Sequence, residues 1–222
     1  MSDKFAIYRP KLQDACQFYG LNVSRETEDS VMMYMEELLK WNNTYNLTAL
    51  KTFDDVFVQH ILDSLSVVPE IKKCAKSDSF TLVDVGSGAG LPGIVLALWF
   101  PNAKVICVDS VNKKMTFVQY VAGKIGCKNV QAIHSRIEEI SPLEADIVIS
   151  RAFASITDFV RLSSIHCKTS GHICAMKSVQ VQEDIDEFTK STNDWLVKEV
   201  KTLQIPELDV TRNLVVIDRK AG

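Results

Sequence analysis

The sequence has no apolar run that fits a membrane span or a secretory signal. The longest uncharged stretch, 85–103, contains a glycine-rich loop and Pro92, which is typical of a loop followed by a buried helix. The N-terminal segment MSDKFAIYRP lacks the apolar core that a signal peptide carries. We therefore expect a protein with no membrane partner.

Cysteine is present, but not at the spacings of metal-binding or redox motifs. The six cysteines stand at positions 16, 74, 107, 127, 167 and 174 without a Cys-x-x-Cys pair, which indicates reduced thiols and a cytoplasmic location. Two of them fall close to His166 and His172, so a metal site is conceivable there. This segment resembles a buried strand, whose alternate residues point to opposite faces, and we expect core residues and no metal.

The chain also lacks an overall positive charge. It has 25 Lys and Arg against 28 Asp and Glu, a net charge of −3, so its totals do not indicate a nucleic-acid binder. The segment 110–136 differs, because it contains no acid and five basic residues: Lys113, Lys114, Lys124, Lys128 and Arg136. Such a segment is compatible with RNA contact and equally with a solvated helix face.

The order of apolar patterns predicts an α/β fold. The first eighty residues have helical spacing, as in 24–43 and 52–68. From Phe80 onward, short Val- and Ile-rich runs alternate with helical segments, which predicts parallel strands covered on both faces. Two final runs, 195–205 and 212–219, have no helix between them and predict an antiparallel pair at one edge. We expect an N-terminal helical extension, 1–75, and a Rossmann-like domain with a mostly parallel seven-stranded sheet, 76–222.

The stretch LVDVGSGAGLPGI, 82–94, fits two glycine templates. Gly88, Gly90 and Gly93 match the dinucleotide pattern G-x-G-x-x-G, with Asp109 at the end of the next strand. The second register uses Asp84 followed by Gly86, Gly88 and Gly90, and it resembles motif I of class I S-adenosylmethionine-dependent methyltransferases. Asp109 would contact a ribose in both registers and does not discriminate between them.

Three features favour the methyltransferase register. An acid before the first glycine suits the ammonium of a methionine moiety and suits a pyrophosphate poorly, since both would be negative. The C-terminal strand pair is placed as in that fold, and no second substrate domain follows. Tyr120 and Lys124 have the Tyr-x-x-x-Lys spacing of some NAD(P)-dependent oxidoreductases, but they lie too early in the chain to face a nicotinamide.

The methyl acceptor is indicated by further absences. The segment after the fourth strand, ISRAFAS, has no (Asp/Asn)-Pro-Pro-aromatic loop of the kind used on exocyclic amines. No Pro-Cys pair supplies a nucleophile for pyrimidine C5. Guanine N7 needs neither device, because its lone pair only has to be aligned with the methyl carbon.

Several motifs in order give a specific resemblance. NLTAL (46–50), HILDSL (60–65), VDVGSGAGLPGI (83–94), VDSVNKKMTFV (108–118), SRIEEI (135–140), ISRAFAS (149–155) and LVVI (214–217) resemble the bacterial ribosomal RNA small-subunit methyltransferase G family, also called glucose-inhibited division protein B. The resemblance runs from about residue 40 to the C-terminus. It implies methyl transfer from S-adenosylmethionine to N7 of one guanine in 16S ribosomal RNA, with that RNA or the small ribosomal subunit as partner.

The resemblance also implies roles for individual residues. Arg151 would be the catalytic residue at the mouth of the site and would also reach the cofactor. The remaining cofactor-binding residues would be Asp84, Gly86, Ser87, Gly88, Gly90, Leu91, Asp109, Ile137 and Glu138. Substrate contacts would come from His60, Lys113, Lys114 and Lys177. Asp63 and Asn46 would point toward the same mouth, although capping explains Asn46 at least as well.

The chain departs from the family pattern in two places, and other functions stay open. It reads MKSV where family members often have a glycine after the lysine, and residues 1–25 match no motif. The runner-up function is a methyltransferase of the same fold acting on another acceptor. An NAD(P)-dependent oxidoreductase and a non-catalytic RNA-binding module are less favoured. We expect a monomer, while the form of the RNA substrate is open.

Overall fold

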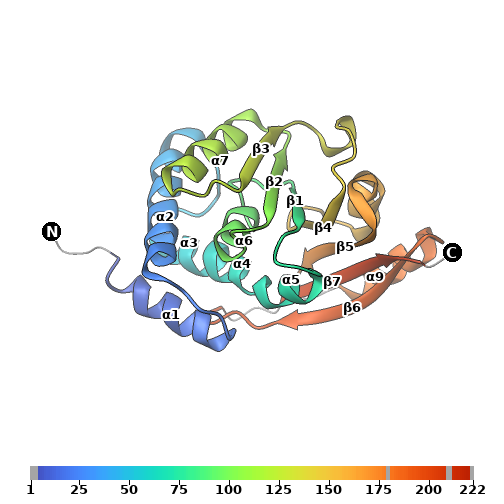
Figure 1. Cartoon of the computed structure of the whole chain (residues 1–222), viewed down its shortest axis with the longest axis horizontal. Coiled ribbons are helices and arrows are strands. Elements are labelled where there is room, and N and C mark those ends of the chain that lie inside the picture. The colour runs from blue at the N-terminus through green and yellow to red at the C-terminus, as the bar shows by residue number, and fades with distance from the viewer. Residues whose placement is uncertain (1–4, 179–180, 209–211, 221–222) are drawn as a thin grey trace.

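A computed structural model describes residues 5–178, 181–208 and 212–220. We expect no signal peptide in the N-terminal segment, but residues 1–4 of that segment lie outside the described residues. Val179, the last residue of MKSV, also lies outside them. The sheet has seven strands in the order β3-β2-β1-β4-β5-β7-β6 (Figure 1). The strands are β1 (Thr81–Val85), β2 (Lys104–Asp109), β3 (Val130–His134), β4 (Ala145–Ser150), β5 (Cys167–Lys177), β6 (Trp195–Leu203) and β7 (Arg212–Arg219).

The predicted sheet is confirmed, including the antiparallel pair. Strands β1 to β5 pair in parallel, and β7 is antiparallel to both β5 and β6. The last strand lies inside the sheet because its apolar centre, 214–217, is buried, as expected for a strand covered on both faces. Strand β6 exposes charged side chains along its length and therefore forms the edge.

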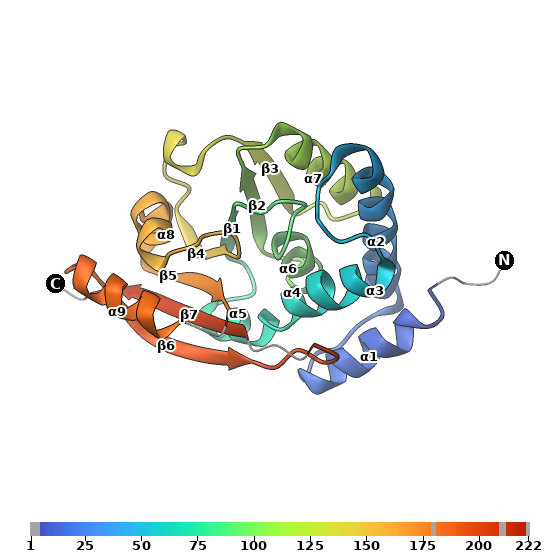
Figure 2. The ribbon, with the colours of Figure 1, turned by 180° about the vertical axis from the view of Figure 1, so that it is seen from behind.

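Helices cover both faces of the sheet. Alternate residues of β1 divide between two core clusters, since Leu82 packs with one and Val83 with the other. The first cluster holds the apolar faces of α1 (Tyr8–Phe18), α2 (Arg25–Tyr45), α5 (Val68–Cys74), α6 (Gly93–Trp99) and α7 (Asn112–Lys124). The second holds those of α8 (Ile156–Ser163) and α9 (Gln182–Ser191). Figures 1 and 2 show α2 beside α7 and α8 beside β5.

The predicted helical character of the N-terminal segment is confirmed. Ser24 and Thr52 cap their helices by accepting hydrogen bonds from the backbone N–H of Thr27 and Asp55, both at 3.1 Å. The N-terminal helices share a core cluster with the sheet, so the predicted domain boundary at residue 75 does not separate two hydrophobic cores. That boundary stays a prediction. In the described parts of the chain, no helix is long and apolar enough to cross a membrane.

A π-helical segment lies within the N-terminal helices and contains residues of the candidate site described below. The helical run of α3 (Phe53–Val56), η1 (Phe57–Leu62) and α4 (Asp63–Leu65) contains a six-residue π-helix. Its wider turn is a feature that often marks functional sites. Gln59 and His60 lie in η1, and Asp63 follows directly. The remaining short elements are η2 (Ile137–Glu139) and η3 (Ser164–His166).

Candidate active site at the carboxyl edge of the parallel strands

The glycine loop between β1 and α6 requires its glycines for two different reasons. Gly86 has a φ of +68°, which is unfavourable for other residues, and a Cβ there would lie 2.8 Å from that of Ala152. Gly93 allows close packing instead, because its Cβ would meet Cys107 Sγ at 2.6 Å. Both glycine templates in the sequence therefore correspond to real structural needs, and the loop by itself does not select between them.

Asp84, in β1, holds the glycine loop through a hydrogen bond to Gly93. The side chain is fully buried, and its Oδ2 accepts a hydrogen bond from the Gly93 N–H at 2.7 Å. Its Oδ1 has no hydrogen-bond partner among the described residues. Burial raises the pKa of Asp84 to about 7. In this arrangement, Asp84 anchors the loop to α6, and the predicted contact with a cofactor ammonium stays a prediction.

Asp109 joins the glycine loop to the end of β2. Its two carboxylate oxygens accept hydrogen bonds from the N–H groups of Gly88 and Val111, both at 2.9 Å, and Lys114 Nζ lies 3.7 Å from Oδ2. The carboxylate lines a hollow that we call the acidic hollow. Its lining includes Gly86, Asp109, Ile137, Glu138 and Phe153.

A second hollow, the loop hollow, lies on the other side of Gly86. Leu47, Thr48, His60, Gly88, Leu91 and Arg151 line it together with Gly86. The two hollows share Gly86, so they meet at the glycine loop. The N–H groups of Gly86, Gly88 and Gly90 already donate to Val108, Asp109 and Ser87. The glycines therefore offer a ligand close approach to the backbone, because no side chain separates the two, but not free N–H donors.

A third and larger hollow, the arginine hollow, has a volume of about 470 Å³. It shares Thr48, His60 and Arg151 with the loop hollow, and Phe153 with the acidic hollow. The three hollows therefore adjoin one another along the carboxyl ends of β1, β2 and β4, the usual place for ligands in open parallel sheets. We call this group of hollows the crescent.

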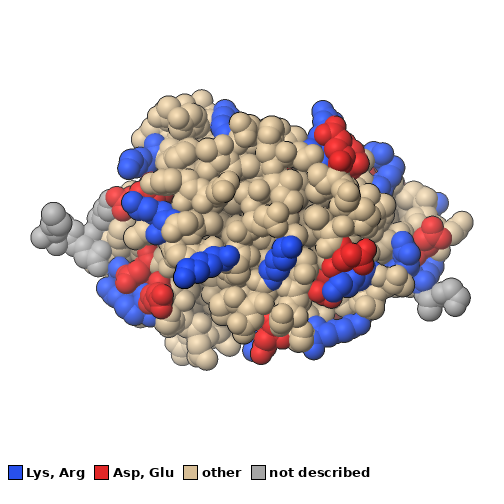
Figure 3. Space-filling model, turned by 45° about the horizontal axis from the view of Figure 1, so that its top comes forward, with Lys and Arg blue, Asp and Glu red and all other residues tan. Residues whose placement is uncertain are grey.

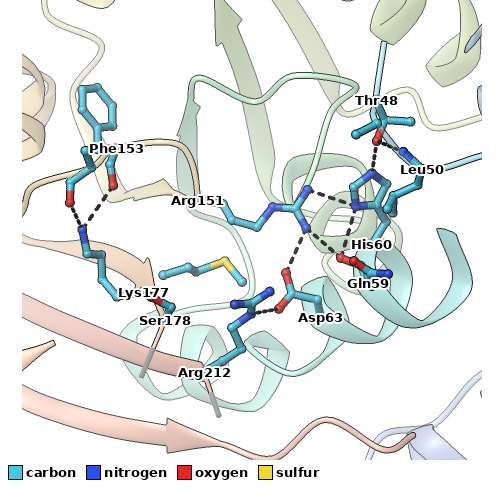
Figure 4. Close-up of a pocket in the computed structure, with 13 residues that line it drawn as sticks. Thr48, Leu50, Gln59, His60, Asp63, Arg151, Phe153, Lys177, Ser178 and Arg212 are labelled. Atoms are coloured by element: carbon cyan, nitrogen blue, oxygen red, sulfur yellow. Dashed lines mark hydrogen bonds and ion pairs between the residues drawn. The ribbon is translucent and has the colours of Figure 1, made fainter. Parts of the chain in front are cut away.

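Two arginines meet on one carboxylate in the arginine hollow. Arg151 Nη1 donates to Asp63 Oδ2 at 2.9 Å, and Arg212 Nε donates to Asp63 Oδ1 at 3.0 Å. Figure 4 shows both guanidinium groups pointing at Asp63. The carboxylate is buried, whereas the two arginine side chains are 26% and 31% exposed. Their remaining N–H donors can therefore reach a ligand.

His60 lies beside this pair in a neutral form. Its Nε2 is 2.9 Å from Thr48 Oγ1, and its Nδ1 is 3.1 Å from the Gln59 carbonyl oxygen. Burial, with the positive charge of Arg151, lowers the pKa of His60 to about 4. The imidazole is therefore uncharged at neutral pH.

Lys177 lines the arginine hollow, but its ammonium is already engaged. It donates to the carbonyl oxygens of Phe153 and Ala154, at 3.2 and 2.5 Å, and pairs with Asp184 Oδ2 at 2.7 Å. These contacts tie the ISRAFAS loop to α9. Contact of Lys177 with a substrate stays a prediction, and holding this loop is the role that the geometry supports.

Comparison with known proteins identifies the family. The model of the family described as "rRNA small subunit methyltransferase G" matches residues 27–215. The chain is 41% identical to "Ribosomal RNA small subunit methyltransferase G" of Bordetella petrii, and the match covers 96% of this chain and 83% of the relative. It is 40% identical to the protein of the same name from Hydrogenovibrio crunogenus, with 96% and 95% covered.

This chain belongs to the ribosomal RNA small subunit methyltransferase G family. The resemblance found in the sequence is thereby confirmed, and the oxidoreductase and the non-catalytic binding module lose their support. Because 96% of the chain aligns with these relatives, the similarity extends from residue 40 toward the N-terminus and includes part of the segment 1–25.

Solved structures agree on the fold. The chain is similar to a S-adenosylmethionine-dependent methyltransferase from Aquifex aeolicus, with a TM-score of 0.56 and 13% identity over 73% of this chain and 92% of that one. It is also similar to a ribosomal protein L11 methylase from Lactobacillus delbrueckii, with a TM-score of 0.54 and 16% identity over 72% and 77%. At these identities the likeness shows the fold, which is the predicted class I methyltransferase fold.

The structure brings most of the family-derived residues together. Gly86, Ser87, Gly88, Leu91, Asp109, Ile137, Glu138, Arg151, His60 and Lys177 all line the crescent. Gly90 lies in the loop, with its N–H donating to the Ser87 carbonyl oxygen. Asn46 ends α2 in a left-handed conformation, with a φ of 50°, so it acts as a helix C-cap.

The basic segment 110–136 does not form one patch at the site. Lys113 and Lys114 lie in the first turn of α7, beside the crescent, and Lys124 ends the helix about 15 Å away along its axis. The face in Figure 3 likewise shows lysine and arginine side chains dispersed, several of them beside acids. RNA contact by Lys113 and Lys114 stays a prediction.

The segment around Cys167 and Cys174 belongs to the core and its edge. His172 Nδ1 pairs with Asp218 Oδ1 at 2.5 Å, and His166 Nε2 contacts the Ile137 carbonyl oxygen at 2.9 Å. Among the described residues, no group of three or more His, Cys, Asp or Glu side chains is placed to hold a metal ion.

Arg212 is a residue of the candidate site that the sequence analysis missed. It opens β7, 149 residues after its partner Asp63. The only local signal was that this arginine stands two residues before the LVVI motif, in TRNLVVI. A charged residue at the end of a strand is common and does not indicate a site.

Proposed function

We propose that this protein transfers the methyl group of S-adenosylmethionine to N7 of a guanine in the 16S RNA of the small ribosomal subunit. The observation that carries the proposal is that three hollows adjoin one another: the acidic hollow shares Gly86 with the loop hollow, and the loop hollow shares Arg151 with the positively charged arginine hollow. The proposal agrees with the printed names of the relatives, which are ribosomal RNA small subunit methyltransferases.

The described residues fit the cofactor. In the acidic hollow, the Asp109 carboxylate suits a ribose diol, and Ile137 offers an apolar wall to a base. The loop hollow lets a ligand approach the glycine backbone closely, and the Arg151 guanidinium in its lining suits the carboxylate at the amino-acid end of the molecule. Bound there, S-adenosylmethionine supplies an electrophilic methyl group on a sulfonium. Both Arg151 and Gly86 line the loop hollow, so the methyl donor and the acceptor can meet at Arg151.

The arginine hollow suits an RNA acceptor. Asp63 neutralises only one of the charges on Arg151 and Arg212, and the ammonium of Lys177 is paired with Asp184. The hollow therefore keeps a net positive charge that attracts phosphate. Its volume lies within the range of small-ligand pockets, about 300–1,000 Å³, so it can hold a base.

The residues of this hollow also suit an acceptor that needs no deprotonation. The one carboxylate among its described lining residues, Asp63, is held by two arginines. His60 is half-buried and hydrogen-bonded to Thr48. An arginine remains protonated and serves as a donor only. Arg151 can donate to guanine O6 or to a phosphate and leave N7 free, so its role is to position the base.

Product analysis tests the acceptor. The purified protein is incubated with methyl-tritiated S-adenosylmethionine and small ribosomal subunits from cells that lack the family member, and the RNA is digested to nucleosides. We expect label in 7-methylguanosine from 16S RNA. Label in another nucleoside or in a ribosomal protein would support methyltransferase activity but refute guanine N7 as the acceptor. Parallel calorimetric titrations with S-adenosylhomocysteine and with NADH test the cofactor. NADH binding would overturn both the proposed cofactor and the proposed acceptor.

We also propose that the protein acts as a monomer in the cytoplasm. The free cysteines of the structure support a reducing compartment. Light scattering of the purified protein, with and without S-adenosylhomocysteine, tests the monomer. Fluorescence microscopy of a tagged chain tests the location.

A further inference from the structure

A ridge of aromatic rings lies on the surface beside the crescent. The Trp41 ring contacts Tyr45 and Tyr120, with centroid distances of 5.2 and 5.0 Å. Tyr45 is 44% exposed and Tyr120 is 36% exposed. The fold needs only part of this arrangement, because the inner side of Trp41 packs on Phe117 at 5.6 Å. The two tyrosine side chains remain partly exposed to solvent.

The ridge continues into a polar groove along α7. Tyr120 belongs to both, and the groove is lined further by Asn112, Thr116, Gln119 and His134. Its volume is about 360 Å³. These side chains offer amide, hydroxyl and imidazole groups next to an exposed ring. Such a combination suits a flat ligand with hydrogen-bonding edges.

Both ends of this surface lie only a few residues of chain from the active-site crescent. Tyr45 precedes Leu47 and Thr48, which line the loop hollow, by two and three residues. The groove begins at Asn112, just after Asp109 and Ser110 of the acidic hollow. A strand whose target base enters the crescent can therefore continue over the ridge.

The charges on α7 suit a nucleic-acid backbone. Lys113 and Lys124 lie seven residues before and four residues after Tyr120, which places all three on neighbouring parts of one helix face. The spacing along the axis is about 10 Å and about 6 Å. Glu37 accepts a hydrogen bond from the Tyr120 hydroxyl at 3.0 Å. It also lies 3.9 Å from Lys40 Nζ, so its charge is partly compensated.

We infer that Tyr45 and Tyr120 form a stacking platform for unpaired bases of the ribosomal RNA strand that flanks the target guanine. Aromatic rings bind single-stranded RNA in this way with little dependence on sequence, because every base has a π-face. The inference rests on the proposed RNA substrate and adds to it a second contact surface outside the site of methyl transfer.

The ring-removal variants Tyr45→Ala and Tyr120→Ala test the platform, and Tyr45→Phe and Tyr120→Phe serve as matched controls. Tyr120→Phe loses the bond to Glu37 but keeps the ring, so its comparison with Tyr120→Ala isolates stacking. Phe18→Ala removes a 56% exposed ring from α1 and controls for the loss of any surface aromatic. Affinity is measured for a short single-stranded RNA oligonucleotide of mixed sequence and for the duplex of the same sequence.

Each alanine variant is expected to lower affinity for the single strand at least about fivefold, with the duplex unaffected. KM for small ribosomal subunits is expected to rise by a similar factor, with kcat and S-adenosylhomocysteine affinity unchanged. The phenylalanine variants and Phe18→Ala should match the wild type. Equal losses for single strand and duplex, or an unchanged KM, would overturn the platform. If the wild type forms no 7-methylguanosine, the proposed function fails instead, so the two failures are distinguishable.

Discussion

The buried carboxylate of Asp63 accepts a hydrogen bond from Arg151 at 2.9 Å, across 88 residues of sequence. The contact joins the π-helical segment of the N-terminal helices to the end of β4. With Arg212 on the other carboxylate oxygen, it sets the position of two guanidinium groups in the arginine hollow. The N-terminal helices therefore take part in the site, in addition to covering the sheet.

Replacing Asp63 should reduce both stability and turnover. Asp63→Ala leaves two arginines without their shared partner, and we expect a loss of about 1–3 kcal/mol in the free energy of unfolding. Methyl transfer should fall further than this loss explains, because both guanidinium groups lose their position. Urea unfolding and initial rates measure the two effects. Asp158→Ala removes an exposed pair of similar length, 2.8 Å to Arg161, and should cost under about 1 kcal/mol. Similar losses for both variants would contradict a special role of Asp63.

Replacing Arg151 should lower turnover more than cofactor affinity. We expect Arg151→Ala to reduce kcat about tenfold to a hundredfold, because the acceptor base is misplaced relative to the methyl donor. The Kd for S-adenosylhomocysteine should change much less, and calorimetry measures it. Equal losses in kcat and in affinity would show that Arg151 serves the cofactor alone.

The same substitution should change the titration of His60. Burial and the charge of Arg151 together lower the pKa of His60 to about 4, so removal of the arginine should raise that pKa toward its ordinary value of 6.5. NMR titration of the imidazole in wild type and Arg151→Ala measures the shift. Wild-type activity should show no inflection from His60 between pH 5 and 8, since the imidazole is neutral throughout. An unchanged pKa in the variant would mean that burial alone sets it.

Asp109 should act mainly on the cofactor. Asp109→Ala removes the carboxylate that faces the acidic hollow and also frees the N–H of Gly88. We expect the Kd for S-adenosylhomocysteine to rise at least about tenfold, which corresponds to the loss of one hydrogen bond to a charged group. RNA affinity, measured by filter binding, should be unchanged. For the neutral isostere Asp109→Asn, the Kd for S-adenosylhomocysteine should fall between the values of the wild type and Asp109→Ala. A larger effect on RNA affinity than on cofactor affinity would refute the assignment.

Asp84 should make stability depend on pH. Burial raises its pKa from 3.8 to about 7, so the folded state binds this proton more tightly than the unfolded chain does. The contribution is fully present below pH 3.8 and is lost as pH rises toward 7, by up to about 4 kcal/mol. Subtracting the urea-unfolding curve of Asp84→Asn at each pH isolates it. A difference that grows in the opposite direction would show that Asp84 is ionised in the folded protein at low pH.

Much of the fold could be predicted because its signals are local. Alternating strands and helices, apolar LVVI and the charged residues of β6 each depend on neighbours in sequence. Helix α9 was missed, since its acids at 183–187 resemble a charged surface segment and only Phe188 is buried. The glycine loop was found, but its glycines alone do not separate the two registers, because Gly86 and Gly93 serve the same turn for different steric reasons. The choice came from Asp84 and the C-terminal strand pair.

The sequence by itself determined the family, the succession of helices and strands along the chain, and most of the residues that gather at the carboxyl ends of the strands. Only the tertiary structure decided which of these side chains remain available to a ligand. Lys177 is occupied by two carbonyl groups and Asp184, Asp84 lies under its loop, and Arg212 joins the site from the last strand. The physical reason is that hydrogen-bond partners and burial depend on contacts between residues far apart in sequence, which local patterns do not encode.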